Sequence, residues 1–302
     1  MRALGTVWLI LLLAGCGAAS AQPVVRLSEL APLPDVSQSG IVPLRVAVAA
    51  VVSPQGTVES YQDLLRYLSA RLGRPVELAQ RRTYAEVNDL IEKGEVDMAF
   101  VCTSAYVAGH DRFGMELLAA PQVNGEAIYY SVLIVPRDSP ARSMADLRGH
   151  VFAFTDPMST SGRMYPTLLV NELGSAPEQF FSRTFFTYSH DDAIRAVAEG
   201  LADGAAVDSI VYDFALRRDP ALAEKTRAIH RSPALGIPPA VVSPKVRPQT
   251  KAELQSLLLG MASDPQGQAA LQALGVDQFV VIDDAAYASV RHLLDQVQPG
   301  AR

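Results

Sequence analysis

Short apolar runs alternate with helix-spaced apolar positions along most of this chain. The run at residues 44–49 is typical of a buried strand, and Leu64, Leu68 and Leu72 then recur at helical spacing. The same periodicities predict strands over residues 76–78, 98–101, 151–154, 185–188 and 205–207, and helices over 58–72, 84–93, 164–173, 191–199 and much of 250–297. Strands that alternate with helices in this way indicate an α/β fold.

The pattern occurs twice, in two segments that lie 106 residues apart. Each segment has a capped helix, a glycine that ends it, a short acidic turn and a buried apolar strand. Gly94 and Asp97 of the first segment match Gly200 and Asp203 of the second. The duplication predicts two lobes of the same construction.

Each copy places one polar residue at the end of its last strand, Cys102 in the first and Asp208 in the second. Ligands of open α/β sheets bind beyond the carboxyl ends of the strands. We therefore expect Cys102 and Asp208 to face each other across a cleft. Tyr84 and His190 are also equivalent, each at the start of a helix.

The apolar run at residues 129–135 predicts a crossing into the second lobe, and residues 238–242 predict the return. The expected division assigns residues 43–134 and 239–302 to the first lobe and residues 135–238 to the second. Two crossing segments form a hinge, which allows closure on a ligand in the cleft between the lobes.

The start of the chain resembles an export signal. Arg2 precedes an apolar run too short to span a bilayer as a helix, and Leu13-Ala14-Gly15-Cys16 matches the bacterial lipobox. This pattern predicts a lipoprotein signal peptide at residues 1–15, lipidation of Cys16, a tether at residues 16–42, and attachment to a membrane in the periplasm. The alternative is ordinary cleavage near Ala21, which leaves a free periplasmic protein.

Composition excludes some classes of function. The formal net charge is −6 and no basic cluster occurs, which argues against nucleic-acid binding. The five histidines are scattered without the spacing of metal ligands, so neither a metal nor a cofactor is expected. The chain has two cysteines, and lipidation of Cys16 would leave Cys102 unpaired, as a buried residue or a reactive thiol.

The segment Ser159-Thr160-Ser161 follows a predicted strand and opens a helix. Three hydroxyl groups at a helix start, together with the free backbone N–H groups and the helix dipole, favour an oxyanion. Simple helix capping would require only one of them. We expect His190 to donate to the same anion and Asp208 to accept a ligand O–H.

The first lobe is expected to supply the opposite wall of this site. Its candidates are Tyr84, Cys102 and Thr103, together with the turn that contains Gln55.

These motifs resemble the phosphate/phosphite/phosphonate-binding (PhnD-like) proteins of ABC importers. The resemblance extends over residues 44–290 and rests on five segments, Phe154-Thr155-Asp156-Pro157 with Ser159-Thr160-Ser161-Gly162, Tyr188-Ser189-His190-Asp191, Ala196-Val197-Ala198-Glu199-Gly200, Ala206-Val207-Asp208-Ser209 and Gly236-Ile237-Pro238-Pro239. It implies a type II periplasmic-binding fold, an ABC permease as partner, and contacts from Ser159, Thr160, Ser161 and His190 to the ligand oxygens.

One departure from the family bears on the ligand. Phosphonate binders of the family carry an acidic residue after the Ile-Pro crossing that meets an aminoalkyl group, whereas this chain has Ile237-Pro238-Pro239-Ala240. The difference favours a small oxyanion with an uncharged tail. Phosphate, phosphite, hypophosphite, methylphosphonate and arsenite remain open as ligands.

Two alternatives to uptake remain. The family also includes periplasmic arsenite sensors that signal to a membrane histidine kinase, and Cys102 is placed to capture the metalloid in such a role. A hydrolase built on Ser161, His190 and Asp208 is disfavoured because the chain lacks Gly-x-Ser-x-Gly. We therefore expect a binding protein and not an enzyme.

Overall fold

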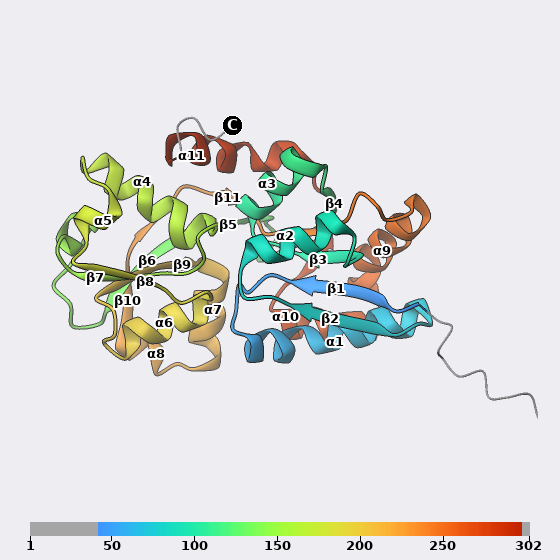
Figure 1. The fold of residues 1–302 in the computed structure, drawn as a ribbon. Helices are drawn as coiled ribbons and strands as arrows, with labels where there is room; N and C mark the ends of the chain where they lie inside the picture. The colour runs from blue at the N-terminus through green and yellow to red at the C-terminus, as the bar shows by residue number, and fades with distance from the viewer. Residues whose placement is uncertain (1–41, 298–302) are drawn as a thin grey trace, which may run out of the picture. The chain divides into compact units, whose positions relative to one another are not determined.

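The computed structural model describes residues 42–297, which contain two large β-sheets flanked by helices (Figure 1). The first sheet has the order β13 (Gln278–Val280), β4 (Glu116–Gln122), β12 (Ala240–Val242), β3 (Met98–Phe100), β1 (Leu44–Val48) and β2 (Val76–Gln80). The second has the order β10 (Thr226–Arg231), β6 (Ser131–Pro136), β9 (Gly204–Asp208), β7 (Val151–Phe154) and β8 (Arg183–Phe186).

The two sheets repeat one topology. In the first, β1 pairs in parallel with β2 and β3, and β12 is inserted antiparallel beside β3. In the second, β7 pairs in parallel with β8 and β9, and β6 is inserted antiparallel beside β9. The duplication predicted from the sequence is confirmed at the level of strand order.

Two short antiparallel strands accompany the crossings between the sheets. They are β5 (Ile128–Tyr129) and β11 (Leu235–Gly236), and they pair with each other rather than with either sheet. Position 135, the expected boundary of the second lobe, falls inside β6, and residue 239 directly precedes β12. The chain thus passes twice between the sheets, once in each direction.

Helices cover both faces of both sheets. They are α1 (Pro54–Leu72), α2 (Tyr84–Lys93), α3 (Thr103–Phe113), α4 (Tyr165–Glu172), α5 (Pro177–Phe180), α6 (His190–Ala198), α7 (Ser209–Arg218), α8 (Leu222–Lys225), α9 (Pro248–Gly260), α10 (Pro265–Leu274) and α11 (Ala288–Val297). Neighbouring strand residues such as Val46 and Ala47 are both fully buried, on opposite faces. Strands buried on both faces explain why their sequences read as continuous apolar runs.

The matched aspartates have the same structural role in the two sheets. The backbone N–H of Arg45 donates to the Asp97 carboxylate at 2.9 Å, and that of Val151 donates to the Asp203 carboxylate at 2.8 Å. In return, the N–H of each aspartate donates to the carbonyl of the same partner residue, at 2.9 Å in both cases. Each aspartate therefore fixes the entry of its third strand beside its first.

Helix starts in the two lobes also correspond. Tyr84 and His190 are the first residues of α2 and α6, after the caps Thr83 and Ser189. Thr83 and Glu86 form the predicted capping box. Gly94 and Gly200 follow the two helices with φ values of 71° and 74°, a left-handed conformation that favours glycine.

Two local predictions differ from the structure, and one helix was not predicted. The strand expected at residues 185–188 is β8 at Arg183–Phe186, since Tyr188 has a φ of 63° and cannot continue a strand. Helix α1 begins at Pro54, and not at residue 58, because Ser53 caps it. Helix α3 was not predicted, since its small and polar residues give it weak apolar periodicity.

The signal peptide at residues 1–15, Cys16 and nearly all of the tether lie outside the described residues. Within residues 42–297, no helix has the length and apolar character that crossing a membrane requires.

The aspartate pairs generate a test of the duplicated architecture. Asp97→Ala and Asp203→Ala should each lower the free energy of unfolding by about 1–2 kcal/mol, because each leaves a strand amide without its carboxylate acceptor. Urea unfolding measures this. Asp→Asn at the same positions keeps an acceptor and should lower the free energy of unfolding by a smaller amount. The exposed Glu253→Ala on α9 is the control and should stay within about 0.5 kcal/mol of wild type; equal values for all the variants would contradict the role assigned to the aspartates.

Candidate functional site

The hydroxyl segment of the second lobe forms a tight turn between β7 and α4. Ser159 caps a π-helical turn at Thr160–Met164, and its Oγ accepts from the N–H of Gly162 at 3.0 Å. A side chain at Gly162 would place its Cβ 1.9 Å from Thr155 Oγ1, so the turn requires glycine there. Ser159, Thr160 and Ser161 are all buried. Single π-helical turns of this kind occur frequently at functional sites.

Thr160 joins this turn to the start of α3 in the first lobe. Its Oγ1 accepts from the backbone N–H of Ser104 at 3.0 Å and lies 2.6 Å from Thr103 Oγ1. Thr103 Oγ1 lies in turn 3.1 Å from the hydroxyl of Tyr129. A side chain of one lobe thus contacts the helix start of the other.

Cys102 lies at the same junction, as the cap residue of α3. Its Sγ is 3.7 Å from Thr160 Oγ1, and its side chain makes no capping hydrogen bond. Burial raises the pKa of the thiol, and the carboxylate of Asp208 adds a smaller contribution in the same direction. The thiol is therefore the stable form at neutral pH.

His190 is buried at the start of α6 and connects three parts of the site. Its backbone N–H donates to the carbonyl of Val51 in the first lobe at 2.9 Å. Its Nδ1 accepts from the backbone N–H of Asp208 at 3.0 Å, and its Nε2 lies 3.5 Å from Ser159 Oγ. Burial lowers the pKa of the imidazole to about 3. The ring is therefore neutral at pH 7, with its single N–H on Nε2, directed toward Ser159.

Asp208 caps α7 at the end of β9. Its Oδ1 accepts from the backbone N–H groups of Ile210 at 2.7 Å and Val211 at 3.3 Å. Burial raises the pKa of the carboxyl to about 7, in spite of these two hydrogen bonds. The group is therefore partly protonated at neutral pH, and in that form it can donate a hydrogen bond.

Two buried hydroxyl groups of the predicted site have no hydrogen-bond partner among the described residues. They are the hydroxyl of Tyr84, from the first lobe, and Oγ of Ser161, from the second. One backbone group of each residue is paired across the site: the N–H of Tyr84 donates to Asp156, and the carbonyl of Ser161 accepts from the hydroxyl of Ser131. A buried hydroxyl without a partner is costly, which makes these two groups candidates for contact with a ligand.

Further contacts hold the same loops together. Asp156 of the second lobe accepts from the N–H of Tyr84 at 3.1 Å, and Asp191 accepts from the N–H of Ser53 at 2.8 Å. At the rim, Arg218 pairs with Glu59 at 3.2 Å. The two lobes are therefore in direct contact around the hydroxyl cluster.

The structure brings together eight of the nine residues expected at the site: Tyr84, Cys102, Thr103, Ser159, Thr160, Ser161, His190 and Asp208. It places Gln55 elsewhere, exposed on the first turn of α1, where its side chain donates to Glu59. Sequence reasoning missed Ser104, which matches the apolar Ile210 in the repeat, and Asp156, which lies two residues after the end of β7. Tyr129 gave no signal, since it lies in an apolar run.

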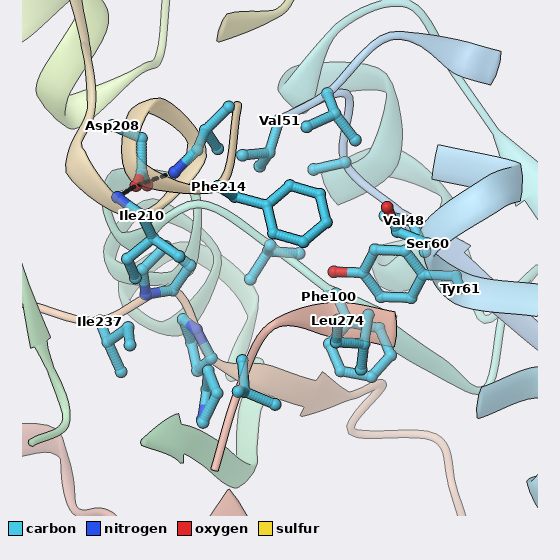
Figure 2. Close-up of a pocket in the computed structure, with 18 of the residues that line it drawn as sticks. Val48, Val51, Ser60, Tyr61, Phe100, Asp208, Ile210, Phe214, Ile237 and Leu274 are labelled. Carbon is cyan, nitrogen blue, oxygen red and sulfur yellow. Dashed lines mark hydrogen bonds between the residues drawn. The ribbon is translucent and has the colours of Figure 1, made fainter. Parts of the chain in front are cut away.

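An apolar cavity adjoins this cluster at Asp208 (Figure 2). Its volume is about 140 Å³, and both lobes and the return crossing contribute to its walls. Figure 2 shows Ile210 and the ring of Phe214, both from α7, and the ring of Tyr61 from α1 beside that of Phe214.

Groups of three or more metal-ligating side chains are not found within residues 42–297. The polar groups of the site are instead hydroxyls, one imidazole and one carboxyl. Such a set suits a small anion that also carries O–H groups, because it offers neutral donors together with an acceptor.

Comparison with known proteins gives a consistent result. A family model for phosphonate periplasmic substrate-binding proteins of ABC transporters matches residues 46–287. The chain is 25% identical over 255 residues to the phosphonates-binding periplasmic protein of Escherichia coli (strain K12), which covers 83% of this chain and 75% of the relative. It is 27% identical over 256 residues to the phosphate-import protein PhnD of Mycolicibacterium smegmatis, and the match covers 78% of this chain and 80% of the relative.

The fold agrees with these relatives. PhnD1 of Prochlorococcus marinus, solved in complex with methylphosphonate, superposes with a TM-score of 0.76 at 18% identity and covers 84% of this chain and 97% of its own. The resemblance inferred from the motifs is therefore confirmed. The chain belongs to the family of phosphonate periplasmic substrate-binding proteins of ABC transporters, and its two sheets are the two lobes of a type II periplasmic-binding fold.

Proposed function

We propose that this protein captures a small phosphorus oxyanion, namely phosphite, phosphate or a simple phosphonate, by closure of its two lobes and delivers it to an ABC permease. The observation that carries this proposal is the pair of buried, unpartnered hydroxyls of Tyr84 and Ser161. They come from opposite lobes and belong to one cluster with His190 and the other hydroxyl groups. An oxyanion between the lobes would satisfy both.

The chemistry of the cluster fits an anion held without a cation. The hydroxyls and the Nε2–H of His190 are neutral donors, and neutral donors in a buried site stabilise a negative charge strongly because competing water is excluded. Asp208 in its protonated form adds a donor, and in its ionised form it accepts from a ligand O–H. A phosphorus oxyanion that retains one proton can accept a hydrogen bond from the protonated form of Asp208 and can donate its O–H to the ionised form.

The relatives support the class of ligand. One is named for phosphonates and one for phosphate import, and the structural neighbour was solved with methylphosphonate. For this chain, the sequence Ile237-Pro238-Pro239-Ala240 favours an uncharged tail. We further propose that Cys16, once lipidated, anchors the mature protein to the membrane that contains the permease.

The arsenite sensor remains the second candidate, because Cys102 belongs to the cluster. Arsenite capture requires a thiolate, and burial raises the pKa of this thiol and disfavours that form. The same burial suits a small apolar residue that packs at the junction of the lobes. The thiol chemistry therefore supports uptake over sensing.

Removal of either unpartnered hydroxyl should weaken ligand binding without lowering the stability of the ligand-free protein. Tyr84→Phe and Ser161→Ala should each weaken the binding of phosphite or methylphosphonate about tenfold or more, because each removes a hydrogen bond to a charged ligand. Without ligand, both variants should be as stable as wild type or more stable by up to about 1 kcal/mol, since an unsatisfied buried group is lost. Titration calorimetry and urea unfolding measure the two effects.

Tyr287→Phe is the matched control for this test. The hydroxyl of Tyr287 donates to the carbonyl of Ile237 at 3.1 Å. Its loss should lower stability by about 1 kcal/mol and leave ligand affinity unchanged. If Tyr84→Phe and Ser161→Ala destabilise the ligand-free chain in the same way and bind phosphite normally, the two hydroxyls do not form the ligand site.

The raised pKa of Asp208 predicts a pH dependence of stability. From about pH 4 to about pH 7 the folded chain holds a proton on this carboxyl that the unfolded chain has released. The contribution of this group to stability is therefore full below about pH 4 and is lost as the pH rises through about 7. Asp208→Asn keeps the two capping hydrogen bonds but does not titrate.

Relative to Asp208→Asn, wild type should lose up to about 1.4 kcal/mol for each pH unit across this window. Urea unfolding of both ligand-free proteins at several pH values tests this, and the effect of His190 is common to both. A difference that does not vary with pH would show that Asp208 is ionised throughout.

Cys102→Ser separates uptake from sensing. If the thiol only packs, phosphite, phosphate or methylphosphonate should raise the melting temperature of wild type and variant alike, since a ligand specific for the folded state stabilises it by mass action. Arsenite should shift neither protein. A shift with arsenite that disappears in Cys102→Ser would overturn the uptake proposal in favour of the sensor.

A further inference from the structure

The cavity beside Asp208 has the composition of a binding site for an apolar group. Strand ends and helices of the first lobe form one wall, including Val48, Tyr61 and Phe100, and α7 forms the opposite wall through Ile210 and Phe214. The return crossing at Pro238 and Pro239 completes it. Figure 2 shows Tyr61, Phe100, Ile210 and Phe214 around a common space.

Charged side chains are almost absent from the lining of this cavity. Among the lining residues, Asp208 is the one acidic side chain, and none is lysine, arginine or histidine. Its Oδ1 already accepts from two backbone N–H groups of α7. An ammonium group in this cavity would be removed from water with this one carboxyl as its sole charged partner among the lining residues, whereas an alkyl or aryl group would gain by burial along most of the lining.

The cavity is connected to the oxyanion cluster through one residue. The backbone N–H of Asp208 donates to His190 Nδ1, and Nε2 of the same ring faces Ser159. The side chain of Asp208 lines the cavity. Asp208 therefore lies between the oxyanion cluster and the apolar cavity, so the cavity is the neighbouring space toward which the substituent of an oxyanion bound at Ser159 and His190 would extend.

The geometry points to an organophosphonate with an uncharged, apolar substituent, such as a short alkyl chain or a phenyl ring, as the ligand class, with the substituent held in this cavity. The volume of about 140 Å³ suits such a group, since an apolar cavity of about 150 Å³ accepts benzene. The inference rests on the proposed function and adds to it the identity of the substituent.

Two isosteric ligands test this directly. Propylphosphonate and 2-aminoethylphosphonate have the same chain length and differ in a terminal methyl or ammonium group. Titration calorimetry on the full chain should find propylphosphonate bound about tenfold more tightly than 2-aminoethylphosphonate, because the ammonium loses its hydration. Propylphosphonate should also bind about tenfold more tightly than methylphosphonate, since two further methylene groups leave water.

A substitution that fills the cavity supplies the second arm. Val211 lines the cavity from α7 and is partly buried, and Val211→Phe should weaken propylphosphonate binding about tenfold while leaving methylphosphonate within about twofold. The control Val58→Phe lies on α1 outside the cavity, at a side chain 47% exposed, and should change neither affinity. A melting curve of each variant confirms folding.

Each outcome is informative. Tighter binding of 2-aminoethylphosphonate than of propylphosphonate would overturn the inference and assign Asp208 to an ammonium. Binding of phosphite and methylphosphonate with no gain for propylphosphonate would overturn it and leave the proposed function intact. Failure of every phosphorus oxyanion to bind would overturn the proposed function as well.

Discussion

The hydrogen bond from the backbone N–H of Ser104 to Thr160 Oγ1 holds the site together. It satisfies an amide at the start of α3, which helix geometry leaves without a partner in its own helix. Because Cys102 offers no side-chain cap, the partner comes from the opposite lobe. The contacts from the N–H of Tyr84 to Asp156 and from the N–H of Ser53 to Asp191 follow the same rule. Three helix starts of the first lobe, those of α1, α2 and α3, are thus satisfied by carboxylates or a hydroxyl of the second lobe, so the candidate site is complete only where the lobes meet.

This arrangement explains the distribution of charge. A buried anion site built on lysine or arginine would have to desolvate those cations whenever it closed, which is costly. Here the donors are hydroxyls and a neutral imidazole, and burial keeps His190 uncharged by lowering its pKa to about 3. Burial also raises the pKa of Asp208, so that the carboxyl tends toward its neutral form. The site therefore carries little charge of its own, and the proposed oxyanion would supply most of the charge.

The sequence predicted much of the fold, because its apolar periods and duplicated segment are strong local signals. The match of Asp97 with Asp203 corresponds in the structure to identical pairs of hydrogen bonds. The strand insertions β12 and β6 did not follow from the pattern, since pairing between distant segments leaves no local trace. Helix α3 was missed because its core contacts come from Ala105, Tyr106 and Val107 at its start, which is not an amphipathic spacing.

The candidate site was predictable to the extent that it uses the starts of helices. Ser159 and His190 were found because a capping residue before a helix is visible in the sequence. Tyr129 was not, because its hydroxyl reaches Thr103 only through the crossing strand β5. The apolar cavity was beyond prediction for a similar reason, since Val48, Phe214 and Pro239 come from three separate parts of the chain. In the sequence such residues have the pattern of ordinary core residues, and it is their shared lining of one cavity that suggests the proposed role in selecting a ligand. Under the proposed function, selectivity among oxyanions would therefore depend on the packing between the lobes, whereas capture of the oxyanion would depend on the helix starts.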